Sequence, residues 1–151
     1  MKIIFIHLLN DFSGSPKVLS QIVKSYKNKN HDVELFTSKD EGFLSNIVDK
    51  HHNFFYKRFE NKFLTLFSYT LSQFHLFFKI LFSKSDIVYI NTLLPFGAAL
   101  GAKISGKEVI YHIHETSIRP NILKKFLRYI VSNTASKIIF VSNDLEQKEK
   151  F

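Results

Sequence analysis

The chain has 151 residues, of which 45% are hydrophobic and 23% charged, which fits one globular domain and excludes a wholly disordered chain. It has no cysteine, which excludes disulfides, thiolate metal sites, iron–sulfur clusters and cysteine nucleophiles. An excess of 21 Lys and Arg residues over 13 Asp and Glu residues gives a formal charge of +8, so nucleic acid, anionic lipid and phosphorylated compounds are all permitted partners.

The chain carries no pattern for membrane insertion or export. No stretch of about 20 residues lacks charge, so we predict no spanning helix. Only five apolar residues precede His7, too few for a signal peptide. We therefore expect a cytoplasmic protein.

Five short runs rich in Ile, Val, Phe and Tyr predict β-strands. The predicted strands are residues 2–7, 32–36, 86–90, 108–112 and 137–141. They mostly lack polar alternation, which is typical of strands buried on both faces of a parallel sheet. Residues 51–58 fit either a short edge strand or a loop.

Segments with helical periodicity separate these strands. The predicted helices are residues 16–29, 61–82, 95–104 and 121–132, with a short helix at 43–48 and a last helix capped by Asn143 or Asp144. Ser15 is the expected N-cap of the first helix, which puts Pro16 at the first helical position. The alternation of strands and helices predicts an α/β fold with an open parallel sheet and helices on both faces.

Polar side chains gather where the predicted strands end, and open α/β sheets bind ligands outside the carboxyl ends of their strands. The residues there are Ser13, Gly14, Ser15, Asn91, Thr92, His112, His114, Glu115 and Ser142. We expect a ligand crevice along this edge, with ordinary solvated loops as the alternative.

The turn formed by Ser13, Gly14 and Ser15 leads into a helix N-terminus. Unpaired N–H groups and the positive end of the helix dipole can hold a phosphate or carboxylate there, and Gly14 would allow close approach. A simple capped turn is an equal alternative. Neither the dinucleotide fingerprint G-x-G-x-x-G nor the Walker motif occurs in the chain.

Three interpretations fit His112, His114 and Glu115. Residues two apart on a strand point to the same side and could hold zinc, but no fourth ligand is evident, so we predict no metal site. A histidine here could instead act as a general base or as a donor to an oxyanion, or could be structural. We assign the structural role to His112 and a catalytic role to His114 and Glu115.

Nine of the 17 Phe residues fall between Phe54 and Phe82. Most of the apolar stripe of helix 61–82, which runs from Phe63 to Phe82, is expected in the core, with flanking lysines reaching solvent. The alternative is an aromatic and basic surface that lies on an anionic membrane. A second basic cluster, at 119–128, is interpreted as a solvated helix face, because RNA recognition would need exposed aromatics among it.

Four motifs in this order carry a family resemblance: SGSPKVL at 13–19, DIVYINT at 86–92, VIYHIHE at 109–115 and SKIIFVS at 136–142. Together they resemble the N-terminal domain of GT-B fold glycosyltransferases of the retaining family 4 type, over about residues 2–144. The resemblance implies a Rossmann-like, acceptor-binding half of a two-domain sugar transferase that uses a nucleotide-sugar donor.

The resemblance also implies roles for the residues at the sheet edge. Ser13, Gly14 and Ser15 would approach the donor diphosphate, where the family usually has two adjacent glycines. His114, followed by Glu115, would face the transferred sugar. Asn91 and Thr92 match the strand end where the acceptor lies, and Ser142 matches the serine at the cleft floor. No cofactor is implied.

The family's glutamate-bearing donor motif belongs to a C-terminal domain for which 151 residues leave no room. We therefore expect an expressed fragment or the product of a truncated gene. Little or no transfer activity is expected from it alone, because both walls of a cleft are needed to fix donor against acceptor.

By analogy, the acceptor would be a surface glycan or a lipid-linked compound, met at the inner face of the membrane, with peripheral membrane contact and no nucleic-acid partner. Two other function classes stay open. One is a non-catalytic, flavodoxin-like binding module. The other is a basic binder of nucleic acid or of a membrane surface.

Overall fold

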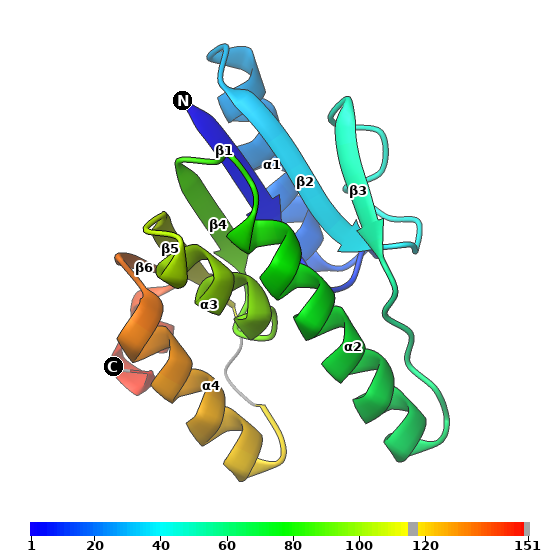
Figure 1. The fold of residues 1–151 in the computed structure, drawn as a ribbon. Helices are drawn as coiled ribbons and strands as arrows, with labels where there is room; N and C mark the ends of the chain where they lie inside the picture. The colour runs from blue at the N-terminus through cyan, green and yellow to red at the C-terminus, as the bar shows by residue number, and fades with distance from the viewer. Residues whose placement is uncertain (115–117, 150–151) are drawn as a thin grey trace.

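The computed structural model describes residues 1–114 and 118–149, which form one open sheet with helices on both faces (Figure 1). The strands are β1 Lys2–Ile6, β2 Asp32–Ser38, β3 Lys50–Phe54, β4 Ile87–Asn91, β5 Glu108–Ile113 and β6 Lys137–Phe140. The helices are α1 Gly14–Asn28, α2 Lys62–Leu81, α3 Phe96–Ile104, α4 Asn121–Thr134 and α5 Asn143–Lys148. The predicted α/β fold is confirmed, and it is Rossmann-like.

The strand order is β3-β2-β1-β4-β5-β6, and each of these pairings is parallel. The chain builds outward from β1 to β3, then crosses back to place β4 on the other side of β1. The carboxyl ends of β1 and β4 therefore flank the point where the order reverses, which is where ligands of such sheets bind.

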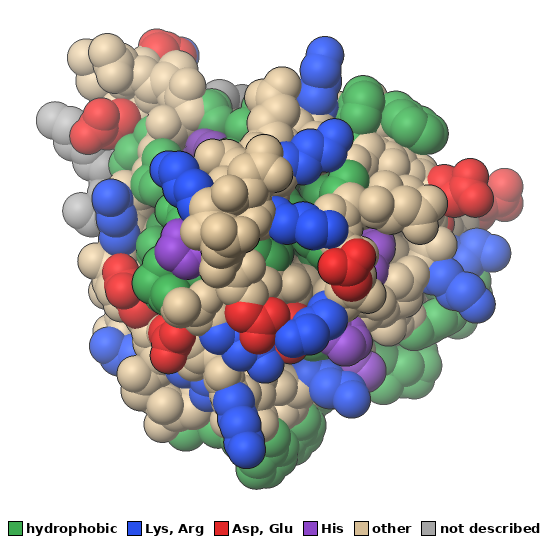
Figure 2. All heavy atoms as spheres, turned by 90° about the horizontal axis from the view of Figure 1, so that it is seen from above, with side chains coloured by type: hydrophobic (Ala, Val, Ile, Leu, Met, Phe, Trp, Pro, Cys, Tyr) green, Lys and Arg blue, Asp and Glu red, His purple; other side chains and the backbone are tan. Residues whose placement is uncertain are grey.

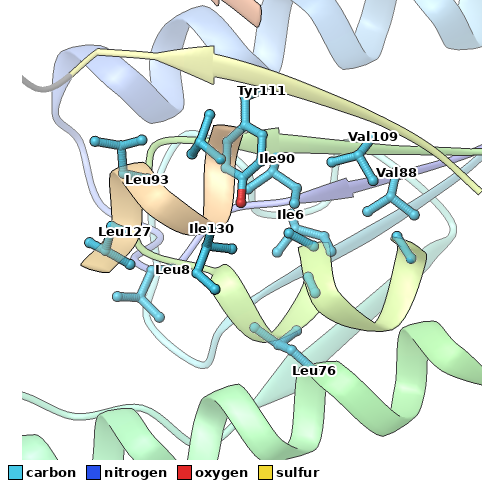
Figure 3. Close-up of a cluster of buried hydrophobic side chains, with 14 of the residues drawn as sticks. Ile6, Leu8, Leu76, Val88, Ile90, Leu93, Val109, Tyr111, Leu127 and Ile130 are labelled. Carbon is cyan, nitrogen blue, oxygen red and sulfur yellow. The ribbon is translucent and has the colours of Figure 1, made fainter. Parts of the chain in front are cut away.

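Alternate residues of β1 serve two separate cores, which explains why the strand is apolar throughout. Ile4 and Ile6 face the larger core, under α2, α3 and α4, while Ile3 and Phe5 face the smaller core, under α1. Figure 3 shows the larger core, with Leu76 of α2 reaching in from beyond α3. A strand covered on both sides has no place for polar alternation.

The five predicted strands agree with the structure to within two residues at each end. Of the two alternatives for residues 51–58, the edge strand is correct for its first part, because Lys50–Phe54 pairs with β2. The imidazole of His52 stacks on Phe36, with ring centroids 4.6 Å apart, and His51 Nε2 lies 2.7 Å from Thr37 Oγ1. These contacts hold a strand whose composition alone is ambiguous.

The predicted short helix at 43–48 is wrong, since the segment forms turns. The buried side chain of Asn10 organises it: Oδ1 accepts from the backbone N–H of Leu44, and Nδ2 donates to the Asp40 carbonyl and to Ser45 Oγ. A Cβ added at Gly42 would lie 2.4 Å from the Asp11 nitrogen, so the loop after β2 sits directly on the loop after β1.

Two predicted helix caps are also wrong. Helix α1 begins at Gly14 with Ser13 as N-cap, so Ser15 lies in the first turn. The Asp11 carboxylate accepts from the backbone N–H and the hydroxyl of Ser13, which turns the chain before Ser15. At α5 the cap is Ser142, whose Oγ accepts from the N–H of Leu145, rather than Asn143 or Asp144.

The expectation that the Phe stripe of α2 is core is wrong. The side chains that point outward are Phe63, Leu66, Phe67, Leu71, Phe74, Phe78 and Phe82. The buried face of α2 carries Ser72, Gln73, Leu76 and Ile80 instead. Gly97 and Gly101 of α3 let the backbones of α2 and α3 approach closely. The small space between them accommodates the buried face of α2 but would not accommodate its phenylalanine rings.

The close approach of α2 and α3 predicts that Gly97→Ala destabilises the chain. Its Cβ would lie 2.1 Å from the Gln73 carbonyl oxygen, a backbone atom that cannot move aside alone. We expect urea unfolding to show a loss of about 1–3 kcal/mol, typical of overpacking. Gly14→Ala is the matched control, because no atom lies within 4 Å of its Cβ. Equal stabilities for the two variants would contradict the packing.

Candidate functional site

Four polar side chains from separate elements meet at the carboxyl edge of the sheet. Asn91, the last residue of β4, donates from Nδ2 to Ser15 Oγ at 2.8 Å. Its Oδ1 lies 2.9 Å from His114 Nε2, just after β5. His7, just after β1, places Nδ1 3.1 Å from the Asn91 carbonyl oxygen. We call His7, Ser15, Asn91 and His114 the edge cluster.

The edge cluster determines which ring nitrogen of His114 carries the proton. Because Asn91 Nδ2 faces the Ser15 oxygen atoms, its Oδ1 faces His114 and accepts a hydrogen bond from the Nε2–H. The lone pair of a neutral imidazole then lies on Nδ1.

His114 is uncharged at neutral pH. Burial, followed by the nearby imidazoles of His112 and His7, lowers the pKa of His114 to about 4. Burial also lowers the pKa of His7 and of His112. The three histidines therefore form a neutral group, and a cationic role for His114 is disfavoured.

His112 occupies a structural position. Its Nδ1 lies 2.9 Å from the hydroxyl of Tyr89, on the adjacent strand β4. Burial raises the pKa of Tyr89, so the phenol keeps its proton beside the imidazole. The ring centroids of His112 and His114 are 4.4 Å apart, so His112 also supports the ring of His114.

The N-terminus of α1 lies beside the edge cluster. Ser13 and Gly14 are exposed, no side chain caps the helix, and its first turn contains no acidic residue. Asp11 stands just before it. Although burial opposes ionisation, hydrogen bonds from Ser13 lower the pKa of this carboxyl, so Asp11 is anionic. The positive charge of Arg58 acts on the same carboxylate.

Thr92 and Ser142 complete the set of predicted residues that the structure describes. Thr92 has φ 86°, a left-handed conformation that is strained for a β-branched residue, and its buried Oγ1 has no hydrogen-bond partner among the described residues. Ser142 is exposed and lies two residues after β6, where the Val141 N–H still donates to the Ile113 carbonyl of β5. Glu115 lies outside the described residues.

A groove of about 760 Å³ opens at the same edge, between the start of α2 and the segment before α4. Leu8, Leu94 and Ile118 line its floor, and each closely follows a strand. Its walls carry Arg58, Lys62 and Arg119 against a single acid, Glu60. The groove thus combines an apolar floor with cationic walls, which suits a ligand with an apolar part and an anionic part.

The opposite edge of the sheet, where the strands begin, carries charges that neutralise one another. Figure 2 shows Lys and Arg side chains intermingled with Asp and Glu on this face. Lys2 pairs with Glu34 and Lys50 with Asp32, each at 2.8 Å. Exposed pairs of this kind contribute little and mark no site.

The structure brings Ser15, Asn91 and His114 together at the predicted edge, whereas His7, Tyr89 and the groove were not predicted. His7 was detectable, because it is the last residue of the first predicted strand. The groove was not, because its lining comes from four distant segments. Within residues 1–114 and 118–149, no three His, Asp or Glu side chains are placed to share a metal ion.

The lowered histidine pKa values predict that the chain becomes less stable as the pH decreases. An unfolded chain, whose histidines titrate near 6.5, binds more protons than the native chain between about pH 6.5 and 4, so acidification through this window favours unfolding. We expect His114→Gln to reduce this loss, as measured by urea unfolding from pH 7.5 to 4.5. Parallel stability curves for the wild type and the variant would contradict the buried neutral imidazole.

Comparison with known proteins places this architecture in a family. The family model of Glycosyltransferase Family 4 matches residues 12–148. No curated protein matches by sequence.

Among solved structures, HepE from Anabaena, in complex with UDP and glucose, is 18% identical with a TM-score of 0.68. The lipopolysaccharide outer core galactosyltransferase WaaB is 21% identical with a TM-score of 0.67. MurG from Acinetobacter baumannii is 12% identical with a TM-score of 0.64.

The alignments cover 99%, 98% and 93% of this chain but only 40%, 41% and 41% of HepE, WaaB and MurG. The chain therefore spans less than half the length of these structures. Since the family match spans most of the chain and the fold agrees with it, the chain belongs to Glycosyltransferase Family 4 and has the fold of the N-terminal half of a GT-B glycosyltransferase.

Proposed function

We propose that this chain is the acceptor-side half of a retaining glycosyltransferase that moves a sugar from a nucleotide sugar to a surface-glycan or lipid-linked acceptor. The observation that carries the proposal is the edge cluster, which joins the start of α1 to His114 through the Asn91 side chain. Family membership favours this function over the flavodoxin-like and nucleic-acid-binding alternatives.

In this proposal the donor diphosphate lies at the start of α1. Ser13, Gly14 and Ser15 offer N–H groups at the positive end of a 15-residue helix, and Gly14 leaves the approach open. The presence of UDP and glucose in the HepE complex is consistent with a nucleotide-sugar donor. The Asp11 carboxylate would repel a diphosphate, so Arg58 is needed to offset it.

His114 is proposed to contact the transferred sugar. Its neutral imidazole is suited to hydrogen bonding with a sugar hydroxyl, and Glu115 would assist it from the next position. Asn91 is fully buried and holds Nε2, so it acts as a positioning residue for His114. Thr92 and Ser142 are proposed to bind the acceptor from either side of His114.

Catalysis is proposed to need a second, nucleotide-sugar-binding domain. A donor fixed from one side only is neither oriented toward the acceptor nor shielded from water. The residues named here require no cofactor. A lipid-linked acceptor would place the protein at the inner face of the membrane, in peripheral contact with lipid.

Nucleotide binding tests the donor site. We expect UDP or GDP titration to shift the amide resonances of Gly14 and Ser15, and Gly14→Ala to weaken binding at least tenfold, about 1.4 kcal/mol. Ser25→Ala, at the far end of α1, is the matched control and should bind normally. Shifts confined to the opposite edge of the sheet would refute the donor site.

Activity tests the need for a second domain. The chain alone is expected to give no product from UDP- or GDP-sugars with lipid-linked acceptors, whereas the same chain joined to a family 4 C-terminal domain should give product. In the joined protein, His114→Ala should lower kcat by about 10²–10⁴-fold, the range typical of a positioned histidine. Turnover by the 151-residue chain alone would refute this requirement.

A further inference from the structure

The outward side of α2 is an uninterrupted apolar stripe, which we call the phenylalanine face. It consists of Phe63, Phe67, Leu71, Phe74, Phe78 and Phe82, whose side chains are 82%, 63%, 44%, 59%, 53% and 78% exposed. Successive members are three or four residues apart, so they share one side of a helix about 30 Å long. Exposed apolar patches of this extent mark sites where another surface binds.

The exposure of this face is built into the fold. The other side of α2 is held by specific contacts: Gln73 Oε1 accepts from the Gly97 N–H at 3.0 Å, and Ser68 Oγ accepts from the Lys57 N–H at 2.8 Å. Rotating the helix to bury its rings would break these bonds and push side chains against the α3 backbone at Gly97 and Gly101. Figure 1 shows α2 as an outer helix of the fold.

The charges around the phenylalanine face have one sign. Helix α2 contains no Asp or Glu. Over residues 57–84 the basic side chains are Lys57, Arg58, Lys62, Lys79 and Lys84, all exposed, and the one acidic residue is Glu60. Cations therefore frame both ends of an apolar strip.

We propose that the phenylalanine face binds an anionic lipid bilayer, with the rings at the boundary between head groups and acyl chains and the lysines among the head groups. Aromatic side chains and snorkelling lysines are the usual composition of such an interface. In this proposal α2 lies along the bilayer surface. Of the helices formed by the described residues, none has the length and apolar character to cross a bilayer.

The charge pattern favours a bilayer over a second copy of the chain. In a twofold dimer through this face, the basic ends would meet basic residues of the partner, with only Glu60 to offset them. An anionic surface complements them instead. The occupant is therefore identified by its charge as well as its apolarity.

The bilayer position fits the groove at the sheet edge. Lys62, Leu66 and Tyr69 of α2 line that groove, while Phe63 and Phe67 of the same turns face outward. A lipid-linked acceptor held in the bilayer would thus have its anionic head group next to Lys62. The proposal deepens the membrane contact named above, but vesicle binding itself does not depend on sugar transfer.

Vesicle flotation of the full chain tests the proposal without donor or acceptor. We expect binding to vesicles of equimolar phosphatidylglycerol and phosphatidylcholine and little binding to pure phosphatidylcholine. The double variant F74Q/F78Q should bind at least tenfold more weakly. Lys62→Gln and Lys79→Gln should each weaken binding about fivefold, as expected for one charge near an anionic surface.

Matched controls use exposed residues elsewhere. Tyr129→Gln, 66% exposed on α4, and Lys24→Gln, exposed on α1, should bind as the wild type does. Thermal unfolding shows whether each variant is folded. If F74Q/F78Q does not fold, Phe63→Gln replaces it, because this substitution removes a ring that is 82% exposed.

Three results would overturn the proposal: equal binding to both vesicle types, equal effects of the control variants, or no vesicle binding. The last holds whether or not the chain forms a dimer that F74Q/F78Q abolishes. Any of these results would leave the transferase assignment intact, because that is tested by nucleotide binding and product formation.

Discussion

The candidate site depends on one side chain, the amide of Asn91. Its nitrogen holds Ser15 and its oxygen holds His114, while its backbone carbonyl faces His7. Three loops that leave the sheet after different strands are thereby fixed relative to one another. Since the amide is fully buried, losing it would leave two or more polar groups without partners in a dry environment. The geometry of the edge follows from this arrangement, whereas burial and the neighbouring imidazoles keep His114 neutral.

A second constraint, the contact of α2 with α3, determines the outer surface. Small residues on α3 allow its backbone to lie close to the backbone of α2. The face of α2 that carries Ser72 and Gln73 fits into this close contact, and its aromatic face does not. Burial of Ser72 and Gln73 is tolerated because both are hydrogen-bonded. The rings are consequently displayed outward next to the cationic groove. The groove and the phenylalanine face thus share helix α2.

Family 4 membership connects these features to sugar transfer, since the chain has the architecture of one half of a two-domain fold. The half described here supplies a helix N-terminus, a neutral histidine and a groove with basic walls. In the proposed function, these three features serve the diphosphate, the sugar hydroxyls and the acceptor respectively. Preorganised groups of this kind act only when both substrates are held, which is why we assign catalysis to a larger assembly.

The amino-acid sequence by itself determined the α/β class, five of the six strands and the edge at which the polar residues gather, because strand burial and parallel pairing leave a local periodic signature. It could not determine which side of α2 is buried, since hydrophobic periodicity marks an apolar face without naming its neighbour. The buried side of α2 is determined by its contact with Gly97 and Gly101, which lie in a later helix of the chain. The turns at 43–48 and the partners of His114 were likewise decided by Asn10 and Asn91, through hydrogen bonds over long sequence separations. Only the tertiary structure brings such groups within bonding distance.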